Sequence, residues 1–87
     1  MEGTLEVRNR LGLHLRAAAT LAETVNRFSS AVTVARGKNQ VSARSVTGLM
    51  MLGAEQGVKL KIRAEGDDAR DAMTAVRKLF EARFNEE

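Results

Sequence analysis

Residues 11–22 read Leu11-Gly12-Leu13-His14-Leu15-Arg16-Ala17-Ala18-Ala19-Thr20-Leu21-Ala22 and join a predicted first strand to a predicted first helix. Gly12 can adopt backbone angles that a side chain forbids, so it predicts a turn. After the turn the apolar spacing becomes helical, and one face would carry Ala18, Leu21, Ala22, Val25 and Phe28. His14 is therefore expected at or just before a helix N-terminus.

The pair His14 and Arg16 is unusual at such a position. A helix N-terminus carries partial positive charge and unpaired amides, so acidic residues are normally favoured there. A cation in the first turn instead fits a bound anion, because free amides, the helix dipole and a guanidinium together form a site for phosphate or sulfate. A neighbouring imidazole could act as a nucleophile toward a phosphoryl group. Taken alone, the pair is also compatible with a surface histidine beside a solvated arginine.

The composition is that of one small domain, covering residues 1–87, with 44% hydrophobic and 29% charged residues. The sequence has no cysteine and one histidine, which excludes disulfides, thiolate zinc sites and histidine-rich metal centres. No apolar run approaches the roughly 20 residues of a membrane span, and no basic-then-apolar signal segment is visible. We therefore expect a cytoplasmic location without membrane insertion.

The net charge of +3 is distributed unevenly along the chain. Residues 1–45 hold seven basic and three acidic side chains, whereas residues 46–87 hold seven and eight. The half that contains His14 is thus the positive half, which raises nucleic-acid binding as an alternative. Such proteins commonly add stacking aromatics, but Phe28, Phe80 and Phe84 fall on apolar helix faces and are expected in the core. Nucleic acid is therefore not expected as a partner.

Apolar patterning predicts seven elements in the order βαββαβα. Strands are expected over 4–8, 30–36, 40–43 and 58–65, and helices over 15–27 and 46–52. Gly66-Asp67-Asp68 opens a last helix, whose buried stripe would contain Ala69, Ala72, Met73, Val76, Leu79, Phe80 and Phe84. Residues 85–87 are expected to fray.

This order predicts an α+β fold. All four strands are two-faced, which favours an antiparallel sheet with the three helices on one face, an open-faced sandwich. A right-handed crossover through the first helix leaves strands 1 and 2 parallel, with a gap that strand 4 can fill. The expected sheet order is 1-4-2-3.

The motifs resemble the HPr family, the histidine-containing phosphocarrier proteins of the bacterial sugar phosphotransferase system. The run Asn9 to Ala19 resembles the family's active-site segment, and residues 44–53, Arg-Ser-Val-Thr-Gly-Leu-Met-Met-Leu-Gly, resemble its regulatory-serine segment. Two further stretches match, Phe28-Ser29-Ser30 and Ala64-Glu65-Gly66. The family usually has a proline directly after the active-site arginine, where this chain has Ala17. The resemblance spans about residues 5–80.

The resemblance implies a carrier with a covalent phosphohistidine, without cofactor or metal, rather than a stand-alone enzyme. His14 would accept a phosphoryl group from Enzyme I, originally from phosphoenolpyruvate, and pass it to IIA-type acceptor proteins. Arg16 would steady the transferred group, and Arg16 and Ala17 would bind phosphate. Partners would contact Leu15, Ala19, Thr20, Val46, Thr47 and Met50.

Ser45 has two predicted roles. Its position just before a short helix predicts an N-cap. The resemblance further implies that an HPr kinase/phosphorylase could phosphorylate it, and that transcriptional regulators are possible partners. Either branch of the system, sugar uptake or nitrogen-related regulation, is compatible with the sequence. The alternative function is an HPr-like regulatory module that acts mainly by protein binding.

Overall fold

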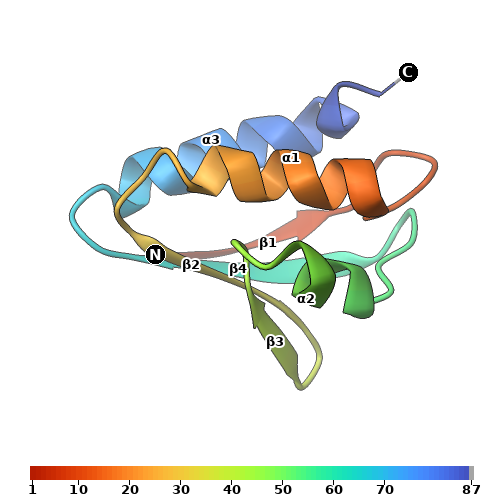
Figure 1. Cartoon of the computed structure of the whole chain (residues 1–87), viewed down its shortest axis with the longest axis horizontal. Helices are drawn as coiled ribbons and strands as arrows, with labels where there is room; N and C mark the ends of the chain where they lie inside the picture. The colour runs from red at the N-terminus through yellow and green to blue at the C-terminus, as the bar shows by residue number, and fades with distance from the viewer. Residues whose placement is uncertain (87) are drawn as a thin grey trace.

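The computed structural model describes residues 1–86, in which the predicted element order is present (Figure 1). The strands are β1 (Glu2–Glu6), β2 (Ala31–Arg36), β3 (Asn39–Ser42) and β4 (Lys59–Glu65). The helices are α1 (Leu15–Val25), α2 (Val46–Met51) and α3 (Ala69–Glu81), followed by a 3-10 turn, η1 (Arg83–Asn85). Among the described residues, no helix is long and apolar enough to cross a membrane.

The four strands form one antiparallel sheet in the order β1-β4-β2-β3, as predicted. β4 lies between β1 and β2, and its strict alternation leaves Leu60, Ile62 and Ala64 fully buried on one face. The other face carries charges, and Lys61 and Arg63 of β4 form ion pairs with Glu2 of β1. This polar face stays uncovered, so the fold is the expected open-faced sandwich.

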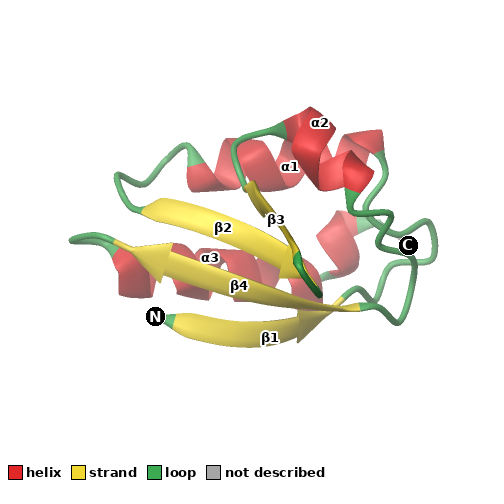
Figure 2. Cartoon of the chain, turned by 90° about the horizontal axis from the view of Figure 1, so that it is seen from below, coloured by secondary structure: helices red, strands yellow, loops and turns green. Residues whose placement is uncertain are grey.

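The helices cover the apolar face of the sheet (Figures 1 and 2). α1 and α3 lie side by side and run in opposite directions, and α2 packs against α1 and β3. Leu21 and Val25 of α1 meet Met73, Val76 and Phe80 of α3 in a single core. Because α1 and α3 are antiparallel, the start of α1 lies near the end of α3, which brings residues 14 and 86 together.

Several boundaries differ from the prediction, those of β2, α2 and β4 by a single residue. β1 spans residues 2–6 instead of 4–8, because Met1 already pairs with Ala64 through two backbone hydrogen bonds of 2.7 and 2.8 Å. α1 ends at Val25, with Asn26 as its C-cap, rather than at residue 27. β3 begins at Asn39, since that residue already pairs with Arg36 across the hairpin.

The prediction that residues 85–87 fray is wrong for the two residues that are described. After α3 the backbone of Arg83, Phe84 and Asn85 turns left-handed, with φ of 55°, 56° and 61°. Such angles cost non-glycine residues about 1–2 kcal/mol each. Phe84 compensates by burying its ring against Phe80, at a centroid distance of 4.9 Å. It is buried as predicted, although from this turn and not from the helix face.

Candidate functional site

His14 is the N-cap of α1, as the sequence predicted. The turn before it depends on Gly12, whose φ is +72° and whose backbone lies against residues 54 and 55. A Cβ at that position would come within 2.6 Å of the Ala54 carbonyl oxygen, and the neighbouring Leu13 amide donates to the same oxygen at 2.8 Å. This close contact fixes where the chain enters α1, and thereby where His14 lies.

Both nitrogens of the His14 imidazole have partners. The backbone amide of Arg16 donates to Nδ1 at 3.2 Å, and Nε2 lies 2.5 Å from Oε2 of Glu86. Because an amide can only donate, Nδ1 holds a lone pair in this arrangement, and we assign the ring proton to Nε2, which donates to the Glu86 carboxylate. The imidazole side chain remains 28% exposed. The geometry therefore presents an unprotonated Nδ1 at the start of a helix.

The Glu86 carboxylate is itself held by Asn9. The Asn9 side-chain amide donates to Glu86 Oε1 at 3.0 Å and to the Gly12 carbonyl oxygen at 2.6 Å. Asn9 is fully buried, so this amide has a fixed position. Asn9, Glu86 and His14 thus form a continuous chain of hydrogen bonds that ends on the ring.

Glu86 is ionised in this environment. Partial burial alone would raise the pKa of Glu86, but hydrogen bonds from Asn9 and His14 and the positive charge of Arg16 outweigh it and lower the pKa below its ordinary value. An ionised carboxylate can accept two hydrogen bonds at once, one on each oxygen. It can therefore serve Asn9 and His14 together.

A groove of ≈ 990 Å³ opens beside His14. Its lining combines the predicted site residues His14, Leu15, Arg16, Ala19 and Thr20 with five residues that were not named as site residues, Arg10, Leu11, Phe84, Asn85 and Glu86. Ala17 does not line it, because its side chain is on the buried face of α1 and packs in the core. Its amide nevertheless belongs to the first helical turn, where no carbonyl within the helix can pair with it.

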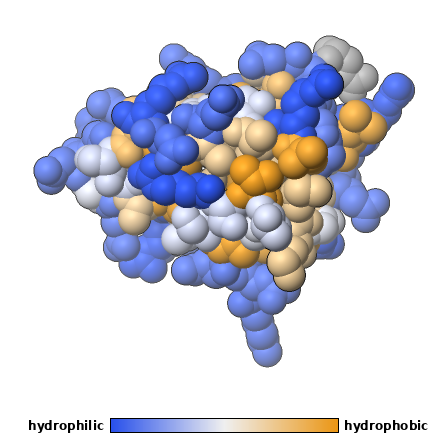
Figure 3. All heavy atoms as spheres, viewed as in Figure 1, coloured by the Kyte–Doolittle hydropathy of each residue, from blue (hydrophilic) through white to orange (hydrophobic). Residues whose placement is uncertain are grey.

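The second predicted segment, residues 45–52, forms α2 beside α1. Ser45 is the N-cap, as predicted, and its hydroxyl accepts a hydrogen bond from the Gly48 amide at 3.0 Å. Among the expected contact residues, Thr47 and Met50 are exposed, whereas Val46 is half-buried against the core. Met51 is also exposed. Apolar side chains consequently gather over the first half of α1 and between α1 and α2 (Figure 3).

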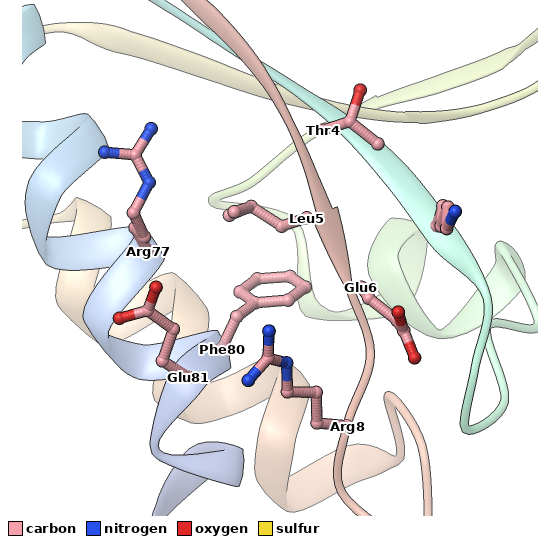
Figure 4. Close-up of a pocket in the computed structure, with 8 residues that line it drawn as sticks. Thr4, Leu5, Glu6, Arg8, Arg77, Phe80 and Glu81 are labelled. Carbon is pink, nitrogen blue, oxygen red and sulfur yellow. The ribbon is translucent and has the colours of Figure 1, made fainter.

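A second, smaller hollow of ≈ 390 Å³ lies between β1 and α3 (Figure 4). It is lined by Thr4, Leu5, Glu6, Arg8, Lys59, Arg77, Phe80 and Glu81. Its two carboxylates offset part of the positive charge of its three cations, and it contains none of the predicted site residues. Residues 1–86 also hold no group of three histidine, cysteine or acidic side chains that could bind a metal ion.

Sequence reasoning missed Glu86 and the role of Asn9. Asn9 was only the first residue of a recognised motif, and Glu86 lies 72 positions from His14 in a segment expected to fray. The one available signal for an ordered C-terminal segment was Phe84, because a large aromatic side chain favours burial over exposure to solvent. A buried residue so near the C-terminus indicates that the following residues are held in place.

The chain matches the family model described as the PTS HPr component phosphorylation site over residues 1–82. It is 44% identical over 87 residues to phosphocarrier protein HPr of Xylella fastidiosa (strain Temecula1), covering all of this chain and 98% of that protein. It is also 37% identical over 86 residues to phosphocarrier protein NPr of Shewanella violacea, covering 99% of this chain and 94% of the relative.

Solved structures show the same fold. The crystal structure of HPr-C-His from Thermoanaerobacter tengcongensis superposes with a TM-score of 0.95 at 42% identity, covering 100% of this chain and 98% of that one. The crystal structure of HPr from Bacillus anthracis gives 0.88 at 29% identity, with 92% and 95% covered. Similarity therefore extends over the sheet, the helices and the loop that holds His14.

Proposed function

The chain belongs to the HPr family of phosphocarrier proteins of the phosphotransferase system, and we propose that it carries the phosphoryl group on Nδ1 of His14. One observation supports this assignment above the others. Nδ1 accepts a hydrogen bond from the Arg16 amide and so holds a lone pair, while Nε2 is engaged by Glu86. A neutral imidazole nitrogen with an available lone pair is a nucleophile near physiological pH.

In the proposed step, the Nδ1 lone pair attacks the phosphorus of a phosphohistidine on Enzyme I. The Nδ1–P bond forms while the bond between phosphorus and the donor nitrogen breaks, and that electron pair returns to the donor imidazole. The Arg16 amide leaves Nδ1 and becomes free to donate to a phosphoryl oxygen. Transfer to a IIA-type acceptor protein is the same step in the opposite sense.

Arg16 and the start of α1 stabilise the transferred group in this proposal. The helix dipole and the unpaired amides of the first turn, including that of Ala17, favour an anion there. The Arg16 guanidinium lines the same groove and adds a charge-assisted donor. Phosphoryl transfer depends mainly on positioning and charge stabilisation, so a small carrier can contribute these groups while partners supply the remainder.

The proposed docking surface for Enzyme I and IIA-type proteins surrounds the groove. Leu15 is 61% exposed and Met50 43% exposed, which is unusual for large apolar side chains. Leu11, 71% exposed, extends the surface beyond the residues predicted from sequence. We place this exchange in the cytoplasm.

Ser45 is proposed as a regulatory site for an HPr kinase/phosphorylase that uses ATP. It is exposed and lies at the start of α2, beside Thr47 and Met50. A phosphate there would add about two negative charges at a helix N-terminus, which the helix tolerates. The same charge within an apolar docking surface would weaken Enzyme I binding, and transcriptional regulators could recognise it.

The deciding experiment is incubation with Enzyme I and labelled phosphoenolpyruvate. We expect one acid-labile, base-stable label per chain and none in His14→Ala. Arg16→Ala should fold normally but take up label about 10–100-fold more slowly, the range for loss of one charge-assisted hydrogen bond. Arg27→Ala, which removes a cation from the far end of the same segment, is the matched control and should label at the wild-type rate.

Two results would contradict the proposal. A label that persists in His14→Ala would place the phosphoryl group elsewhere. Tight binding to Enzyme I or to a regulator without any label on the wild-type chain would favour the purely regulatory module.

A further inference from the structure

We infer that Glu86 is a positioning residue for this site: its carboxylate holds the Nε2–H of His14 and thereby keeps the lone pair on Nδ1. The inference rests on the proposed function and adds a residue that neither motif contains. The contact is short, with Nε2 and Oε2 2.5 Å apart, and the Glu86 side chain is only 14% exposed. Solvent therefore competes weakly for the Nε2 proton.

The carboxylate cannot rotate away freely, because its second oxygen is also engaged. Oε1 accepts from the buried Asn9 amide at 3.0 Å, and the same amide is anchored on the Gly12 carbonyl oxygen. Gly12 belongs to the turn that positions His14. The ring and the group that orients it are thus fixed to the same turn, which is the arrangement of a nucleophile, an orienting group and a support for that group.

The backbone leading to Glu86 is also specialised. Three successive non-glycine residues, Arg83 to Asn85, adopt left-handed angles, which such residues rarely do. Phe84, 4% exposed, anchors the turn in the core, and its neighbours point the chain back toward α1. The turn η1 contacts α1 directly. Sparsely populated backbone angles gathered at a site indicate a functional constraint.

Glu86 would also act after transfer. When Nδ1 bonds to phosphorus, Nε2 keeps its proton and the ring becomes a phosphoimidazolium cation. No proton has to move, since the ring proton stays between Nε2 and the carboxylate. The negative charge of Glu86 then offsets the ring's positive charge, so the orienting group stabilises the transferred state as well as the nucleophile.

The first test measures the ring without any partner. Imidazole ¹⁵N shifts of the full chain, recorded at alkaline pH, should show Nδ1 as pyridine-type and Nε2 as pyrrole-type. In Glu86→Ala the acceptor is lost, and in the isosteric Glu86→Gln one amide oxygen must serve two donors. We expect both nitrogens to move toward averaged values in each variant, with Glu81→Gln, an exposed carboxylate removed from α3, remaining like the wild type. Unchanged nitrogen shifts in both Glu86 variants would overturn the inference.

The second test measures transfer in a single turnover from phosphorylated Enzyme I. Both Glu86 variants should reach the same final label as the wild type but about 10-fold more slowly, while Glu81→Gln should match the wild type. Wild-type rates in the Glu86 variants would refute the positioning role and leave the carrier function intact. A wild-type chain that takes up no label would instead refute the proposed function, and the nitrogen shifts would still report whether Glu86 orients the ring.

Discussion

Replacing Gly12 with alanine tests how the turn before α1 is held. The left-handed φ of +72° would cost an alanine about 1–2 kcal/mol, and the loss of unfolded-state freedom would return about 0.4–1 kcal/mol. The new Cβ would also lie 2.6 Å from the Ala54 carbonyl oxygen, a backbone atom that cannot swing away. The loop must then shift, and the hydrogen bond from the Leu13 amide to that oxygen, worth about 0.5–1.5 kcal/mol, is weakened. We expect a total loss of about 2 kcal/mol.

Gly37→Ala supplies the matched control. Gly37 has a similar φ of +60°, but a Cβ there would meet nothing within 4 Å. Only the net cost of the left-handed backbone conformation applies, so we expect the unfolding free energy to fall by about 1 kcal/mol or less. Urea unfolding followed by circular dichroism measures both variants, and with an m-value of about 1 kcal/mol/M the Gly12→Ala midpoint should fall by about 2 M. Equal destabilisation by the two substitutions would refute the role assigned to the contact with Ala54.

Three further outcomes can be measured by the same unfolding assay. Ser45→Ala removes the cap on the Gly48 amide and should lower the unfolding free energy by about 1 kcal/mol, whereas Ser45→Asp should restore it. The Ser30 hydroxyl, together with backbone amides, lowers the pKa of Asp68. The stability that this carboxylate contributes is therefore present above about pH 4 and is lost as pH falls through the lowered pKa. Asp68→Asn should be less stable than the wild type at pH 7 and should lose less stability on acidification. Phe84→Ala should lose about 3 kcal/mol, and a loss below 1 kcal/mol would contradict the anchoring of the C-terminal turn.

Local sequence patterns determined most of the fold and the positions of the site residues that lie at helix starts. The change from alternating to helical spacing at residues 11–22, the alternation of β4 and the acidic start of α3 fix elements whose residues are neighbours in the chain. The positions of His14, Arg16 and Ser45 at helix starts were predictable for the same reason. Four two-faced strands and a right-handed crossover then left one sheet order.

Only the tertiary structure decided what His14 faces. The antiparallel packing of α1 and α3 brings the end of the chain to the start of α1, and the buried ring of Phe84 turns the backbone so that Glu86 reaches the imidazole. No local sequence pattern predicts a contact between residues 72 positions apart, because its geometry depends on how all the intervening strands and helices pack. The proposed nucleophile could therefore be named from its motif, whereas its contact with the Glu86 carboxylate became visible only once the helices were packed.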